Sequence, residues 1–242
     1  MTGLKKFFTF FIGFTTLVCG VDAQTQDSYE YQSEFTWGIN KNSYGGLIGG
    51  FVFKKAHKIN ERVLETFGLE IMNVKHPQEV RQNSQSTGNY FIFGKSNYLY
   101  ALRFQYGRDF IIFKKAPQQG VEIKAVGAIG PSFGIVAPYY IERAADGGYV
   151  TVREQYNPGI EASEIYGPGR LFEGLGESKV KVGANAKAAI NFELGTTKSQ
   201  VTGFEAGMLL DAYPGKIILV PTAKNYAVFP TLFFTLFYGA RK

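Results

Sequence analysis

Cysteine, histidine and tryptophan are scarce in this chain of 242 residues, which has one Cys, two His and one Trp. The single cysteine, Cys19, excludes an internal disulfide framework. Without a Cys/His cluster no zinc site is predicted, and the acidic loop 154–177 lacks the Asp/Asn/Gly spacing of a calcium loop. No Gly-rich loop joins a strand to a helix, so no nucleotide site is indicated. We therefore expect no metal and no cofactor.

Long apolar runs are also missing after the first residues. No later stretch reaches the roughly 20 apolar residues that a membrane-spanning helix needs. Charged residues make up only 19% and aromatic residues 16%, a mixture too apolar for a disordered chain. The formal net charge of +6 is scattered, which is typical of a solvated surface and does not indicate nucleic-acid binding.

The N-terminus has the pattern of a secretory signal. A basic start, MTGLKK, precedes the apolar stretch FFTFFIGFTTLVCG and a cleavage-site pattern ending at Ala23. This pattern predicts a signal peptide over 1–23, a periplasmic N-terminal extension over 24–33 and one domain over 34–242. A lipoprotein acylated at Cys19 is an alternative, but Val18 is bulkier than such sites usually accept.

The segment VKVGANAKAAINFELG, residues 180–195, shows what that domain is made of. Every second residue from Val180 to Leu194 is apolar, whereas the residues between them are charged, amide-bearing or very small. Because successive side chains of a strand point to opposite faces, this period of two predicts one long β-strand. The same alternation recurs in seven further segments: 34–40, 46–56, 66–71, 98–107, 121–135, 203–211 and 231–238.

The polar faces of these segments decide between a soluble barrel and a membrane barrel. They hold mainly Gly, Ala, Ser and Thr with one to three charges each, as a narrow interior requires, whereas a soluble barrel presents a well-charged face to water. We therefore predict a closed antiparallel transmembrane β-barrel of eight strands, with a soluble barrel or a sandwich as alternatives. The residues expected to face lipid include Val182, Ala186, Ile190, Phe192, Phe234, Leu236 and Tyr238.

The connections support this topology. The tetrapeptide FKKA occurs at 53–56 and 113–116, and each copy is expected to close a strand at a short periplasmic turn. Long Gly-, Pro- and Asn-rich connections, 76–97, 142–178 and 212–229, are expected to be extracellular loops. Gly107–Asp109 interrupts the alternation, which a β-bulge would explain. Ten strands stay open, with two more drawn from 147–156 and 216–220.

The signal peptide, the eight alternating segments and the ending LFFTLFYGARK resemble the small outer-membrane β-barrel proteins of Bacteroidetes-type bacteria. The resemblance covers roughly residues 30–242. It implies the outer membrane of a Gram-negative bacterium, both barrel termini in the periplasm, and insertion by the barrel-assembly machinery. The residues GARK after Tyr238 depart from the usual ending on an aromatic residue. Few members of this group have an assigned activity, so the resemblance implies a location more than a function.

Charged residues on the polar faces should meet inside the barrel. Buried charges must be paired and hydrogen-bonded, and both signs are present in equal number. Arg103 in particular is expected beside Glu70 and Glu122 on neighbouring strands. The predicted lumen network is Glu70, Arg103, Glu122, Lys124, Lys181, Lys187, Glu193 and Glu205. A paired network fills the barrel, and a narrow polar channel is the alternative.

No catalytic residue is predicted. Of the two histidines, His57 falls in an expected periplasmic turn, and His76 lies in a long loop near Glu79, Ser84 and Ser86, where we expect a solvated side chain. The sequence therefore favours a non-catalytic outer-membrane barrel that acts as a binding or structural subunit of a membrane complex. A small outer-membrane enzyme, of the lipid A-modifying or protease type, is the alternative. Expected partners are outer-membrane lipids including lipopolysaccharide, other outer-membrane proteins and the barrel-assembly machinery.

Overall fold

The computed structural model describes residues 31–46, 48–114, 120–145, 150–170, 173–194 and 199–242. The predicted signal peptide, and all but the last three residues of the predicted extension, lie outside these ranges. Among the described residues no helix is long and apolar enough to cross a membrane.

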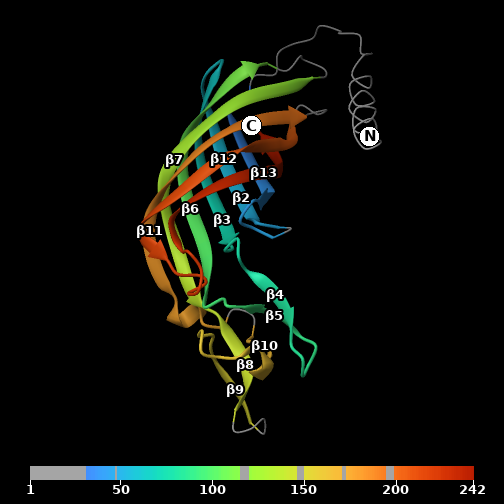
Figure 1. Cartoon of the computed structure of the whole chain (residues 1–242). Helices are drawn as coiled ribbons and strands as arrows, with labels where there is room; N and C mark the ends of the chain where they lie inside the picture. Colours follow the sequence, from blue (N-terminus) through green and yellow to red (C-terminus); the bar gives the residue numbers. More distant parts are fainter. Residues whose placement is uncertain (1–30, 47, 115–119, 146–149, 171–172, 195–198) are drawn as a thin grey trace, which may run out of the picture.

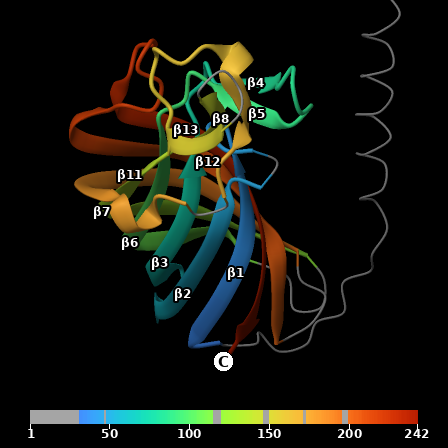
Figure 2. The same ribbon diagram turned by 90° about the horizontal axis from the view of Figure 1, so that it is seen from below.

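A closed barrel of eight strands forms the body of the molecule (Figures 1 and 2). Around the barrel the strands follow the order β1-β13-β12-β11-β7-β6-β3-β2, and every neighbouring pair is antiparallel. Pairing of the first strand with the last closes the sheet, so no edge is left along most of its length. The barrel strands are β1 (Ser33–Asn42), β2 (Gly50–Asn60), β3 (Val63–Val74), β6 (Asn97–Phe113), β7 (Val121–Pro138), β11 (Lys179–Leu194), β12 (Gln200–Ile217) and β13 (Tyr226–Arg241).

Side chains alternate strictly between the inside and the outside of the barrel. On β13 the even-numbered residues Leu232, Phe234 and Leu236 are exposed, whereas Thr235 and Phe237 are buried. The outer surface is thus apolar and the inner one carries the polar groups, the reverse of a soluble barrel. The prediction of an all-β, eight-stranded transmembrane barrel is confirmed.

Connections at the two ends of the barrel differ in length. One end, called here the turn end, holds the C-terminus and short connections such as Glu61–Arg62 between β2 and β3 (Figure 1). The opposite end, the loop end, carries the segments 75–96 and 139–178. These segments fold into a hairpin, β4 (Val80–Asn83) with β5 (Tyr90–Phe93), and a three-stranded sheet, β8 (Tyr140–Ala145), β9 (Val150–Gln155) and β10 (Ile165–Pro168). Two 3₁₀ turns, η3 (Ala162–Glu164) and η4 (Leu175–Glu177), complete the loop end.

The structure resolves the strand count and corrects two details of the sequence analysis. The segment around 150–155 is a strand of the separate sheet, so the barrel has eight strands and not ten. No bulge occurs at Gly107–Asp109, because β6 alternates through it and its register shifts only between Ile111 and Phe113. The first FKKA copy lies inside β2, which continues through His57 to Asn60 before it turns. Residues 115–116 of the second copy lie outside the described residues.

Candidate functional site

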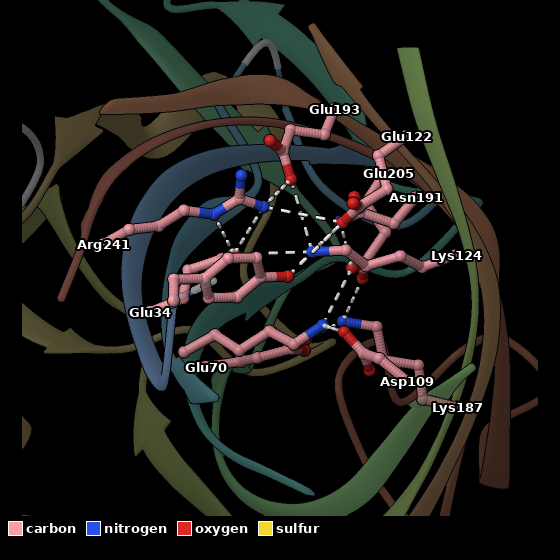
Figure 3. Close-up of polar contacts among 12 residues, drawn as sticks. Glu34, Glu70, Asp109, Glu122, Lys124, Lys187, Asn191, Glu193, Glu205 and Arg241 are labelled. Carbon is pink, nitrogen blue, oxygen red and sulfur yellow. Dashed lines mark hydrogen bonds and ion pairs between the residues drawn. The ribbon is translucent and has the colours of Figure 1, made fainter. Parts of the chain in front are cut away.

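The interior of the barrel is filled by two groups of charged side chains and an apolar plug. The first group lies at the turn end. Lys124 on β7 is paired with Glu34, Glu122 and Glu193 at 3.4, 3.1 and 3.3 Å. Arg241, near the end of β13, pairs with the same three carboxylates, at 3.1 Å from Glu34 and 3.5 Å from Glu122, and forms its shortest contact with Glu193. These side chains come from four strands and converge in the lumen (Figure 3).

Tyr31 packs against this group at the turn end of the barrel. Its ring stacks against the Arg241 guanidinium, 3.9 Å from the ring centroid, and its hydroxyl donates to Glu122 at 3.4 Å. Burial raises the pKa of the Tyr31 phenol to about 12, and the nearby Lys124 ammonium opposes that shift. Tyr31, two residues before the first strand, is therefore part of the lumen packing.

The second group lies nearer the middle of the barrel. Lys187 bridges Glu70 at 2.8 Å and Glu205 at 2.7 Å. Lys54 bridges Asp109 at 2.6 Å and Glu205 at 3.5 Å, which ties β2 across the lumen to β6 and β12, neither of which is its neighbour in the sheet. All these side chains are largely or completely buried.

Arg103 is held mainly by a residue that the sequence analysis did not place in the network. Its Nε lies 3.0 Å from both carboxylate oxygens of Asp211, and a second guanidinium nitrogen lies 2.5 Å from Oδ2. The Glu70 carboxylate is 3.3 Å away, and Ser132 donates to Asp211 at 2.8 Å. The expected contact with Glu122 does not form, because Glu122 belongs to the turn-end group.

The structure thus brings together seven of the eight residues predicted for the lumen. The exception is Lys181, which shares their face of β11 but is exposed and has no ion-pair or hydrogen-bond partner among the described residues. The structure also adds charged residues that the sequence analysis did not include: Glu34, Lys54, Asp109, Asp211 and Arg241.

The sequence already indicated that several of these added residues point inward. Glu34 and Asp211 already lay on the polar faces, and continued alternation beyond Tyr238 puts Arg241 inside. Lys54 and Asp109 were left out of the predicted network, because Lys54 was assigned to the end of a strand at a turn and Asp109 to a bulge. With these residues the described lumen holds more carboxylates than cations, and neutral donors such as Asn191 and Ser132 supply further hydrogen bonds to them. Asp109 Oδ1 and Glu193 Oε1 are buried without a hydrogen-bond partner among the described residues.

An apolar cluster closes the lumen at the loop end. Leu99, Ile217, Leu219 and Phe229 are at most 2% exposed, and they pack with Tyr213 and residues of β2 and β3. Below this plug, a cavity lined by Lys54, Lys187 and their neighbours measures about 10 Å³. That volume holds about one water molecule, which leaves no path for a solute there.

The loop-end hairpin and three-stranded sheet share their own core, and together they are called here the loop-end module. The core consists of buried residues from both: Phe91, Tyr139, Ile141, Tyr156, Ile160 and Ile165. Ser96 anchors the module to the barrel, because its hydroxyl donates to the Tyr156 carbonyl and its own carbonyl accepts from Tyr139 N–H and Gln155 Nε2. The long connections therefore form a packed β structure instead of extended loops (Figure 1).

His76 is buried at the base of this module, contrary to the expected solvated side chain. Its Nε2 lies 3.1 Å from the Lys224 carbonyl, and its Nδ1 accepts the Gln78 N–H at 3.1 Å. Glu79 accepts the His76 N–H and pairs with Lys95 at 2.8 Å. Burial lowers the pKa of Lys95, and the Glu79 carboxylate opposes that shift. Both ring nitrogens of His76 are engaged with main-chain groups, so neither is available as a base.

The residues predicted to face lipid all lie on the outer surface, where Val182, Ile190 and Leu236 are exposed and Phe192 is half-buried against Phe204. Trp37 and Tyr238 stack edge to face beside them, with ring centroids 6.3 Å apart. Among the described residues no group of three or more His, Cys, Asp or Glu side chains is arranged to hold a metal ion.

Comparison with solved structures finds small outer-membrane β-barrels of Gram-negative bacteria. The attachment invasion locus protein Ail of Yersinia pestis is 13% identical over 88% of this chain and 99% of its own, with a TM-score of 0.43. The N-terminal barrel domain of Pseudomonas aeruginosa OprF is 8% identical over 88% and 98%, with a TM-score of 0.39. Neisserial surface protein A is 14% identical over 87% and 93%, with a TM-score of 0.32. No protein-family model and no curated protein matches the sequence.

Proposed function

We propose that this protein is a non-catalytic barrel of a Gram-negative outer membrane that presents the loop-end module to a binding partner, as a binding or structural subunit of a membrane protein complex. The observation that carries the proposal is the combination of a filled lumen with a module that has its own apolar core. A plugged barrel that supports a packed β structure is suited to hold a surface in place. Transport would require an open path.

The proposal includes a location and an orientation. The turn end, with both termini of the barrel, faces the periplasm, and the loop-end module faces the outside of the cell, as short turns and long loops are distributed in such barrels. A signal peptide over 1–23 and insertion by the barrel-assembly machinery belong to the same proposal, and so does an origin in a Bacteroidetes-type bacterium.

Cysteine labelling tests the orientation, because Cys19 leaves with the proposed signal peptide. Tyr90→Cys introduces a thiol on the exposed hairpin of the module, and Lys114→Cys introduces one at the turn end. A membrane-impermeant maleimide should label only Tyr90→Cys in intact cells and both variants after the outer membrane is opened. The reverse pattern would overturn the orientation.

Binding is tested by removing most of the module. Replacing residues 142–167 with a short Gly-Ser linker keeps the barrel strands and removes β9 and most of β8 and β10. Proteins cross-linked to the wild type in intact cells should be lost from this variant, whereas a matched variant with the single exposed change Val150→Ser should retain them. If the same proteins are recovered without the module, the module is not the binding element. Steady conductance in planar bilayers would contradict the filled lumen.

A further inference from the structure

The barrel wall is incomplete at one place near the loop end. The ladder between β11 and β12 ends at Ala184 opposite Ala212, although β11 continues outward to Lys179. The register between β12 and β13 also breaks between Ala212 and Ile217. Residues 179–183 are therefore paired only with β7, and one side of their backbone is left open.

This open edge lies beyond the part of β11 that crosses the membrane. The exposed outward residues from Leu194 to Ala184 already cover the roughly 10 residues that a tilted strand needs to cross a bilayer. Unpaired backbone is not tolerated against hydrocarbon, so residues 179–183 belong at the level of the lipid headgroups.

Three lysines without partners surround the open edge. Lys216 lies on the outward face of β12, whereas Lys179 and Lys181 lie on the face of β11 that turns to the lumen farther along the strand. All three are exposed, and none has an ion-pair or hydrogen-bond partner among the described residues. The acidic residue next to them in sequence, Glu177, accepts a hydrogen bond from the Tyr140 hydroxyl at 2.8 Å. The patch thus combines positive charge with free N–H donors, the features that favour an oxyanion.

Apolar side chains lie at the level of this patch on the outer face and continue from it into the membrane. Val180 and Val182 are 59% and 56% exposed on the outer face of β11, and Met208 and Leu210 line β12 nearby. We propose that the open edge, with Lys179, Lys181 and Lys216, binds the phosphate-bearing headgroup of a membrane lipid whose acyl chains lie along Met208 and Leu210. This site depends on the transmembrane placement of the barrel but not on the binding role of the module.

Lipid retention in native mass spectrometry tests the site, with the protein refolded in neutral detergent and titrated with bisphosphorylated lipid A. The wild type should retain the lipid and should bind the dephosphorylated form far more weakly. Lys179→Gln/Lys181→Gln/Lys216→Gln should weaken retention by about a hundredfold, since each of the three basic residues near anionic lipid contributes about a fivefold factor. The matched control, Lys55→Gln/Lys58→Gln at the turn end, should bind like the wild type.

Three outcomes would overturn the proposal. These are unchanged retention in the triple variant, an equal loss in the turn-end control, and competition by inorganic phosphate at the lipid's own concentration, which would indicate an anion site without lipid contacts. Folding of each variant is checked by the difference in gel migration before and after boiling. If the triple variant does not fold, the single variant Lys216→Gln is measured instead, because it changes only one outward side chain. Its lipid retention should fall about fivefold.

Discussion

Arg103 shows why single residues inside the barrel matter for stability. Its guanidinium is the shared cation of Asp211 and Glu70, and all three side chains are at most 3% exposed. Arg103→Ala leaves the Asp211 carboxylate without a cation in a water-poor interior, so we expect the free energy of unfolding in detergent to fall by about 3–5 kcal/mol. Arg153→Ala is the matched control, because its pair with Glu142 at 2.7 Å is partly exposed, and it should cost less than about 1 kcal/mol.

A double-mutant cycle then separates the two partners of Arg103. Combining Arg103→Ala with Asp211→Asn should recover more of the loss than combining it with Glu70→Gln, since Asp211 makes the bidentate contact and Glu70 retains Lys187. Strict additivity in both cycles would mean that these residues do not interact.

The buried Tyr31 should make the stability of the protein depend on pH. Its pKa is raised to about 12 by burial, whereas an unfolded tyrosine titrates near 10. The folded protein therefore keeps this proton at a pH where the unfolded chain has lost it. The stabilisation is complete below about pH 10 and is lost as the pH rises through about 12. Unfolding measured from pH 9 to 12 should show a steeper loss in the wild type than in Tyr31→Phe, and parallel curves would refute the assignment.

At the scale of one strand, the two faces of β11 should respond differently to substitution. Ala186 is exposed on the outer face, so Ala186→Arg places a charge at mid-membrane and should destabilise the protein by about 2–4 kcal/mol. Ala186→Leu, at the same position without charge, should be nearly neutral. Unfolding in lipid vesicles measures both, and equal effects would mean that this face does not contact lipid.

The neighbouring Asn185 illustrates what alternation alone does not reveal. From the sequence, Asn185→Ala would be expected to be mild. The structure shows its amide donating to the carbonyls of Gly130 and Pro131, each at 3.0 Å, and lying 3.4 Å from the Phe104 carbonyl. Pro131 has no N–H, so the ladder between β6 and β7 is interrupted opposite Phe104 and the Asn185 amide fills the gap. Asn185→Ala should therefore cost about 1–3 kcal/mol in the same assay.

For the whole molecule, a closed sheet with buried ion pairs predicts resistance to detergent. Unheated protein should migrate faster in gels than boiled protein, because the folded barrel stays compact until heat breaks it, and the mature chain should fractionate with outer membranes. Recovery from the soluble periplasmic fraction would contradict the placement. The deletion variant lacking residues 142–167 should keep the gel shift, since the module lies outside the barrel ladder.

The sequence by itself determined the barrel. Alternation over eight segments specifies which side of each strand is apolar, and a sheet with one wholly apolar face and a narrow polar face has one stable closure in a membrane. The inward side of seven lumen charges and the outward side of every residue predicted to face lipid followed from that same period of two. Lys54 and Asp109 were lost only where a turn or a bulge was assumed.

Tertiary structure decided the rest. Period two says that a charge points inward but not which partner it meets, because strand stagger and barrel closure bring together residues as distant as Arg103 and Asp211. The alternation also does not predict that two long loops pack into one module or that main-chain contacts bury His76. Nor does it predict that the ladder between β11 and β12 ends before β11 does. Such features depend on non-local packing and on where each backbone group finds its hydrogen bond, which a local pattern does not specify.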